Sequence, residues 1–136
     1  MQTLDQSLMR SETLESSNRL LHQTSHLQPL LEPLVSKLRQ HPPRLLITCG
    51  RGSSDHAGVF IRYMFETALG IPSSSATPST HSVYGGNTQL DNSLVILISQ
   101  SGQSPDLVEY AQAARASGAL TVGLINQDGS TPLVRG

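Results

Sequence analysis

The sequence is poor in several residue types, and each shortage excludes a class of protein. Its 136 residues include one cysteine, which excludes an intramolecular disulfide framework and a cysteine-based zinc cage. Aromatic residues make up 4 % of the chain, with no tryptophan, which argues against a platform on which nucleic-acid bases stack. The longest apolar run, residues 94–98, has the length of a strand and falls far short of the roughly 18 residues of a membrane span.

The chain also lacks an excess of charge of either sign. Nine Lys and Arg residues face ten Asp and Glu residues, so the formal net charge is −1. This balance indicates no basic surface for nucleic acid or for an anionic membrane, and we expect the chain to bind neither. Because the N-terminal residues are polar and show no signal-peptide pattern, we expect a cytoplasmic protein.

Residues 1–43 form a segment without glycine, in which leucine and valine side chains recur at steps of three and four residues. This spacing is typical of one face of a helix. Pro29 and Pro33 fall inside the pattern, and proline is tolerated mainly in the first turn of a helix. We therefore expect an N-terminal helical segment with one helix over residues 3–27 and a second that starts near Pro29 or Pro33.

From residue 44 onward, short apolar runs alternate with helical patterns and with turns rich in glycine and serine. The apolar runs predict strands at residues 45–49, 94–98 and 120–125, and residues 73–77 could form a weak additional strand. The helical patterns predict one helix ending at Leu69 before Gly70, and another with the Ser104 hydroxyl as its N-cap. Alternating strands and helices are typical of a parallel sheet with helices on both faces. The expected fold of residues 44–136 is α/β, a doubly wound, flavodoxin-like parallel sheet flanked by helices and incomplete at its C-terminal end.

Two serine-rich loops hold the polar residues with the clearest chemistry. One loop, residues 50–55, follows the first predicted strand, and the other, residues 99–104, follows the third. A loop between a parallel strand and a helix presents free backbone N–H groups and the positive end of the helix dipole to an anion. Glycines allow close approach and hydroxyls add neutral donors, so the expected ligand is a phosphate monoester that also carries hydroxyls. The candidate binding residues are Gly52, Ser53, Ser54, Ser99, Gln100, Ser101, Gly102, Gln103 and Ser104.

The order of the strands decides whether the two loops form one site. In a sheet of order 2-1-3-4, the first and third strands are neighbours, and open α/β sheets bind ligands in the crevice between such loops. The alternative is that each loop is only a turn that begins a capped helix, since serine caps are common.

Other candidate motifs are incomplete. Gly50-Arg51-Gly52 opens like a dinucleotide fingerprint, but Asp55 stands where the third glycine belongs. The only lysine, Lys37, lies in the N-terminal segment, so the chain has no Walker motif. Arg51 could reach a phosphate, although an arginine in a turn is usually solvated.

The cysteine and the histidines give weaker signals. Cys49 ends a predicted buried strand and is interpreted as an inert core thiol. His56 could face the crevice from the first helical turn, or could be a solvent-facing or structural histidine. His22 and His26 lie four residues apart on a predicted helix, but no carboxylate completes a metal set. We therefore expect no metal site and no cofactor.

Two segments resemble the sugar isomerase (SIS) domain family. Residues 49–57 read Cys-Gly-Arg-Gly-Ser-Ser-Asp-His-Ala, and residues 98–106 read Ile-Ser-Gln-Ser-Gly-Gln-Ser-Pro-Asp. The resemblance covers about residues 44–136 and is strongest to the isomerase half of glutamine–fructose-6-phosphate aminotransferase and to SIS-type glucosamine-6-phosphate deaminases. It implies the phosphosugar-binding first domain of an amino-sugar phosphate isomerase or deaminase, with glucosamine-6-phosphate or fructose-6-phosphate as its ligand.

The resemblance also implies roles for individual residues. Ser53 and Ser54, with Gly52 beside them, fall where the family contacts the sugar phosphate, and the loop that begins at Ser99 falls on its phosphate-binding loop. The catalytic glutamate, lysine and histidine of the family lie beyond its first domain, and this chain has no matching positions, so we predict no catalytic residue. The resemblance further implies a homodimer for the full-length parent. The alternative function is a non-catalytic sugar-phosphate sensor domain.

Overall fold

The computed structural model describes residues 8–127 and 131–135. The described residues form two compact units, and the chain passes from the first to the second between His41 and Pro42. Each unit is described by itself. Among the helices of these residues, none is both long enough and apolar enough to span a membrane.

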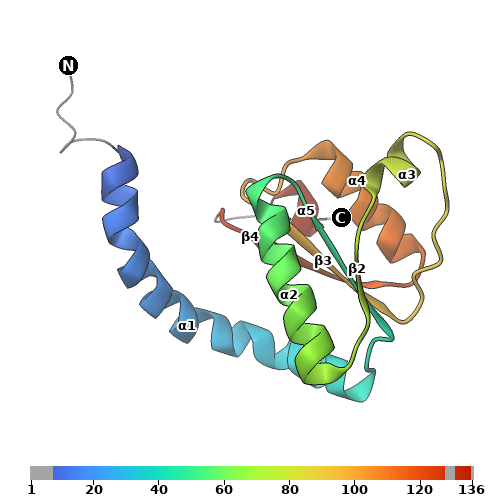
Figure 1. Ribbon diagram of the computed structural model, residues 1–136, viewed down its shortest axis with the longest axis horizontal. Helices are drawn as coiled ribbons and strands as arrows, with labels where there is room; N and C mark the ends of the chain where they lie inside the picture. The colour runs from blue at the N-terminus through green and yellow to red at the C-terminus, as the bar shows by residue number, and fades with distance from the viewer. Residues whose placement is uncertain (1–7, 128–130, 136) are drawn as a thin grey trace. The chain divides into compact units, whose positions relative to one another are not determined.

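The first unit is a single helix, α1 (Leu8–Gln40), which contains both Pro29 and Pro33. The prediction of two helices, with a break at one of these prolines, is therefore wrong for the described residues; residues 3–7 lie outside them. Each proline removes one intrahelical hydrogen bond and crowds the carbonyl of the preceding turn, which bends a helix without necessarily ending it. Figure 1 shows α1 as one continuous, curved ribbon.

The second unit is built on a four-stranded sheet with the order β2-β1-β3-β4. The strands are β1 (Leu45–Gly50), β2 (Ser73–Ser75), β3 (Ser93–Ser99) and β4 (Leu120–Ile125). All three pairings are parallel, and β1 pairs with β3 from Leu45↔Ser93 to Gly50↔Ile98. The predicted order and the adjacency of the first and third strands are thus confirmed.

Helices cover both faces of the sheet, as a doubly wound fold requires. The helix after β1 is α2 (Ser53–Leu69), and the helix after β3 is α4 (Pro105–Ala116). Because right-handed crossovers lead from the centre of the sheet toward opposite edges, the two helices lie on opposite faces (Figure 1). Gly70 ends α2 in the left-handed conformation, with φ 66°, and its N–H donates to the Glu66 carbonyl, as predicted.

The core lies between the sheet and α4. Successive residues of a strand point to opposite faces, so Ile47 and Cys49 of β1 share one face with Val95 and Leu97 of β3. Buried residues of α4 pack against this face; they are Leu107, Tyr110, Ala111 and Ala114. On the opposite face Leu46, Thr48 and Leu94 are also fully buried.

Two short helices were not predicted. They are α3 (Pro78–Ser82) after β2 and α5 (Pro132–Arg135) after β4. The Arg115 guanidinium fixes α5, because its Nη2 donates to the Leu133 carbonyl at 3.2 Å while its Nε donates to Thr121 Oγ1 at 2.8 Å. Helices of four or five residues carry too little hydrophobic periodicity to be recognised in a sequence.

Gly58 of α2 packs directly against Thr48 of β1. A Cβ built there would lie 2.9 Å from Thr48 Oγ1 and 3.2 Å from Thr48 Cβ. Thr48 is fully buried and its hydroxyl also accepts a hydrogen bond from Arg62, so it has little room to move. Glycine is normally unfavourable inside a helix, but close packing on Thr48 requires it at position 58.

We predict that Gly58→Ala lowers the free energy of unfolding by about 1 kcal/mol, although alanine has the higher helix propensity. Overpacking against Thr48 outweighs the propensity gain. Chemical denaturation measures the change, and Ala57→Gly, at the exposed neighbouring position, is the control that should lose about 1 kcal/mol through propensity alone. A more stable Gly58→Ala variant would contradict the close packing of α2 on β1.

Candidate functional site

The two predicted serine loops meet at the carboxyl edge of the sheet. Because Gly50 pairs with Ile98 at the ends of β1 and β3, the loops that follow these strands start side by side. Between them lies a cavity of about 240 Å³, which we call the serine cleft. Its lining residues are Arg51, Ser53, Ser54, Ile98, Ser99, Gln100, Ser101, Ser104 and Leu107.

Six of the nine predicted binding residues line the serine cleft. They are Ser53, Ser54, Ser99, Gln100, Ser101 and Ser104. The three others, Gly52, Gly102 and Gln103, belong to the same loops but are not part of the lining. The structure thus brings together hydroxyls from segments about fifty residues apart in sequence, at the switch point of the sheet.

The loop after β3 is held in shape by its own serines. The Ser99 hydroxyl accepts a hydrogen bond from the Gly102 N–H at 3.0 Å, and the Ser101 hydroxyl accepts one from the Gln103 N–H at 3.3 Å. Each hydroxyl keeps its own O–H as a donor, because accepting a bond uses only a lone pair. The serines can therefore shape the loop and still donate to a ligand oxygen.

Gly102 is enclosed at the turn of this loop. Its φ is +64°, and a Cβ built there would lie 2.6 Å from Thr131 Oγ1 and 3.1 Å from Ile125 Cγ2. The Gly102 carbonyl also accepts a hydrogen bond from the Leu133 N–H at 3.3 Å. The loop after β3 is therefore packed on the residues that follow β4, and the role of Gly102 is to shape this loop rather than to line the cleft.

The Ser104 hydroxyl does not cap α4, contrary to the prediction. Ser104 occupies the N-cap position with φ −62° and ψ 117°, but its side chain makes no capping hydrogen bond. Its backbone carbonyl accepts from Leu107 and Val108, which starts the helix. Because Ser104 lines the serine cleft instead, its hydroxyl remains available to a ligand.

The loop after β1 turns directly into α2 through two glycines. A Cβ at Gly50 would lie 3.0 Å from the carbonyl carbon of Ser54, and Gly52 adopts φ 57°. The Gly52 carbonyl accepts a hydrogen bond from the Asp55 N–H at 3.1 Å, and only two residues separate the end of β1 from the start of α2. This tight turn sets Ser53 and Ser54 in the first turn of the helix, at the edge of the cleft.

An ion pair connects the two loops, and sequence reasoning missed it. Arg51 Nη1 lies 2.5 Å from Asp106 Oδ2 in the first turn of α4. Of the residues that line the cleft, Arg51 is the one that carries a charge. The side chain of Arg51 is 70 % exposed and that of Asp106 is 29 % exposed. The signal for this contact is not local, since the two residues are 55 positions apart and belong to a loop and to a helix that follow different strands.

Cys49 lies behind the cleft and is unreactive in its environment. The side chain is 2 % exposed, and burial raises the pKa of the thiol from 9.0 to about 12, a rise to which Asp106 and Asp55 add and which Arg51 opposes. Burial and the nearby thiol likewise raise the pKa of Tyr110. A protonated, buried thiol is neither a nucleophile nor a metal ligand, which agrees with the interpretation as a core residue.

The two histidines of the second unit, His56 and His81, do not line the cleft. His56 is exposed in the first part of α2 and is not part of the lining, and His81 contacts the Gly86 carbonyl through Nδ1 at 3.2 Å. Within residues 8–127 and 131–135, no group of three or more His, Cys, Asp or Glu side chains is placed to share a metal ion.

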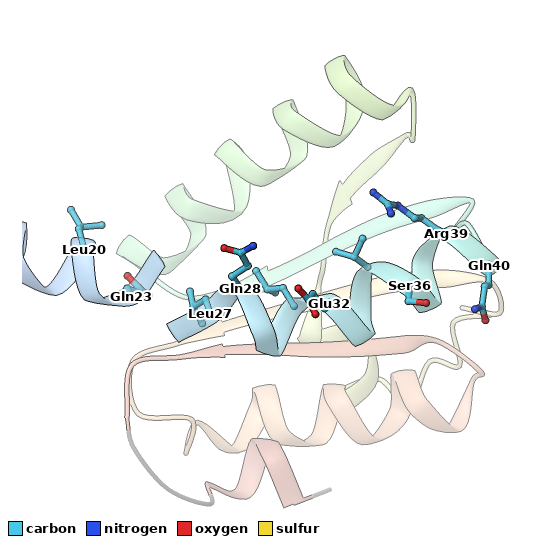
Figure 2. A pocket seen from close by; sticks show the side chains of 10 residues that line it. Leu20, Gln23, Leu27, Gln28, Glu32, Ser36, Arg39 and Gln40 are labelled. Carbon is cyan, nitrogen blue, oxygen red and sulfur yellow. The ribbon is translucent and has the colours of Figure 1, made fainter. Parts of the chain in front are cut away.

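A larger hollow, of about 950 Å³, lies along α1. Figure 2 shows its ten lining side chains, all of which project from this one helix and include leucines, glutamines, Glu32 and Arg39. Polar groups from different elements do not converge on it, as they do in the serine cleft. A surface formed by one helix lacks the enclosure of a small-molecule site, so the smaller cleft is the better candidate.

Comparison with known proteins decides the family. A family model described as the SIS domain matches residues 39–135, which is most of the chain. The chain belongs to the SIS domain family.

Curated relatives of this SIS domain are much longer proteins. Glutamine–fructose-6-phosphate aminotransferase (isomerizing) of Aquifex aeolicus is 38 % identical over 94 residues, which are 69 % of this chain and 15 % of that protein. The protein of the same name from Pyrococcus horikoshii is 33 % identical over 99 residues, which are 72 % of this chain and 16 % of that protein. The chain therefore spans less than a fifth of the length of these relatives.

Solved structures agree with this assignment. A Silicibacter pomeroyi structure named as a phosphosugar isomerase superposes with a TM-score of 0.87 at 38 % identity, covering 92 % of this chain and 38 % of that one. Tagatose-6-phosphate ketose/aldose isomerase of Escherichia coli superposes with a TM-score of 0.67 at 19 % identity, covering 86 % and 33 %. The second likeness concerns the fold alone. The SIS domain is thus related to phosphosugar isomerases and to the isomerase domains of the aminotransferases.

We predict that Gly102→Ala destabilises the SIS domain more than Gly70→Ala does. Both glycines have positive φ, so each alanine costs about 1–2 kcal/mol for the left-handed conformation. Only Gly102 also faces Thr131 within 3 Å, and overpacking adds about 1–3 kcal/mol, whereas a Cβ at Gly70 meets nothing within 4 Å. Denaturant titration measures the free energy of unfolding of both variants. Equal losses would show that the loop after β3 is not packed on Thr131.

We further predict that stability falls as the pH rises above 9. The unfolded chain ionises Cys49 near its ordinary pKa of 9.0, whereas the folded chain keeps the proton to about pH 12. The stabilisation is complete below pH 9 and is lost as the pH rises through 12. Denaturation midpoints at pH 8, 9.5 and 11 measure the effect, and the midpoint should fall less steeply with pH in Cys49→Ala. Iodoacetamide should label the thiol only after unfolding; rapid labelling of the native chain at pH 8 would refute its burial.

Proposed function

We propose that the serine cleft binds the phosphate group of a sugar phosphate, and that this SIS domain is the phosphosugar-binding part of an amino-sugar phosphate isomerase or deaminase. The convergence of six predicted residues from two distant loops on one cavity carries the proposal. The relatives support the ligand class, because their names contain fructose-6-phosphate and phosphosugar.

The cleft suits an anion held mainly by neutral donors. Serine hydroxyls from both loops line it, and α2 and α4 both begin at its edge, which adds the positive ends of two helix dipoles. A hydrogen bond from a neutral donor to a charged group contributes roughly 1.5–3 kcal/mol, so several of them hold a phosphate without a lysine. The hydroxyls of the sugar extend the same pattern of contacts.

The lining favours binding over proton transfer by this chain. Among the described residues that line the cleft there is no carboxylate, lysine or histidine to act as a general acid or base. The second candidate function, a sugar-phosphate sensor, draws its support from this composition. Turnover assays of the whole parent protein separate the two functions, because a sensor binds the phosphosugar and returns it unchanged.

Removal of single hydroxyls tests the binding site. We predict that Ser54→Ala and Ser101→Ala each weaken binding of fructose-6-phosphate or glucosamine-6-phosphate about tenfold to a hundredfold, because each loses one hydrogen bond to a charged group. Ser104→Ala should weaken binding similarly and leave the free energy of unfolding within about 0.5 kcal/mol, because its hydroxyl caps nothing. Calorimetric titration and thermal melts measure the two quantities.

Ser82→Ala is the matched control, since Ser82 lies on α3 outside the cleft and its hydroxyl donates only to the Pro78 carbonyl. It should bind like the parent chain. If all three cleft variants also bind like the parent, the loops are only turns between a strand and a helix, and the proposed site is wrong.

A further inference from the structure

Arg51 and Asp106 place opposite charges on the two sides of the serine cleft. Arg51 lies in the loop after β1 and lines the cleft, whereas Asp106 stands in the first turn of α4, next to the lining residue Leu107. Their contact, at 2.5 Å, involves one guanidinium nitrogen and one carboxylate oxygen. A guanidinium has five N–H donors, so most of the donors of Arg51 are not used by this pair.

We propose that Arg51 recognises the charge of the phosphate, and that Asp106 is an internal anion with which the phosphate competes for this guanidinium. The inference rests on the proposed function and adds a specificity-determining residue to it. The bound phosphate monoester displaces Asp106 from Arg51, and the ion pair re-forms when the ligand leaves.

The exposure of the pair makes this exchange favourable. Arg51 is 70 % exposed, and an ion pair so accessible to water contributes little stability, so it opens readily. A phosphate monoester carries up to two negative charges and three acceptor oxygens, and arginine matches such a group with parallel hydrogen bonds. The dianion is therefore the stronger partner for the guanidinium.

Asp106, by contrast, lowers the affinity of the cleft for a phosphate. The carboxylate occupies the first turn of α4, where the helix dipole stabilises a negative charge and where a phosphate would gain from the same field. It also repels a phosphate in the neighbouring cleft. The two charges thus predict opposite effects on binding, whereas a purely structural clamp between the loops predicts that loss of either partner weakens binding equally.

The test compares Arg51→Gln and Asp106→Asn in the full chain, with fructose-6-phosphate and inorganic phosphate as probes. We expect Arg51→Gln to weaken binding of fructose-6-phosphate about tenfold and to reduce its salt dependence, because one charge-assisted contact is lost. We expect Asp106→Asn to tighten binding about threefold to tenfold, since the competing anion is gone. The double variant should bind like Arg51→Gln, because most of the effect of Asp106 acts through Arg51.

The chain offers matched controls for both substitutions. Arg44→Gln removes a positive charge from an exposed residue just before the start of β1, at the end of the strand opposite the cleft. Glu109→Gln removes a negative charge from an exposed residue of α4 that does not line the cleft. Both should bind within twofold of the parent. Melting temperatures of all variants show whether a change in binding reflects a change in folding.

The outcomes distinguish the inference from the proposed function. If the parent binds fructose-6-phosphate and both Arg51→Gln and Asp106→Asn weaken it equally, the pair is a structural clamp and the inference is overturned while the proposed function stands. Unchanged binding in both variants overturns it as well. If the parent binds neither probe, the proposed function fails and the inference fails with it.

Discussion

The pairing of β1 with β3 is the constraint on which the rest of the second unit depends. Their register runs in parallel over six residue pairs and ends at Gly50 and Ile98. Because both chains then turn at the same edge of the sheet, two loops about fifty residues apart are forced into one cleft. The helices that follow must leave toward opposite faces, so each presents its N-terminus to that cleft. Neither loop could form the cavity without the strand of the other.

Much of this arrangement could be predicted because it follows from local patterns with a simple physical cause. The apolar runs that became β1 and β3 are nearly continuous, as expected for strands covered on both faces. Gly70 and Gly118 stop helices at the positions where a left-handed residue is needed, with φ 66° and 84°. The strand order was a hypothesis drawn from the fold class rather than from any single residue, and the expectation that the serines share one site depended on it.

What could not be predicted depends on more than the residue type at a single position. Pro29 and Pro33 were expected to break the N-terminal helix, yet α1 runs through both, since local steric cost alone does not decide where a helix ends. Ser104 has the residue type and position of an N-cap, but its side chain lines the cleft instead of bonding to the helix. The Arg51–Asp106 pair spans 55 residues of sequence, and no periodicity or motif encodes it.

The distribution of charge is compatible with the proposed anion site, although the chain has a single lysine, outside the SIS domain, and a net charge of −1. The attraction comes from serine O–H groups, backbone N–H groups and two helix ends, which are neutral in sum and therefore leave no trace in the composition. The one cation of the lining, Arg51, is balanced by Asp106 at 2.5 Å, so the pair adds little net formal charge to the cleft. The pKa of Cys49 reflects the same balance, because Asp106 raises it and Arg51 lowers it while burial dominates. If the cleft binds a phosphosugar as proposed, it therefore selects its ligand by the geometry of its donors first and by charge second, which suits a phosphate attached to a polyhydroxyl chain.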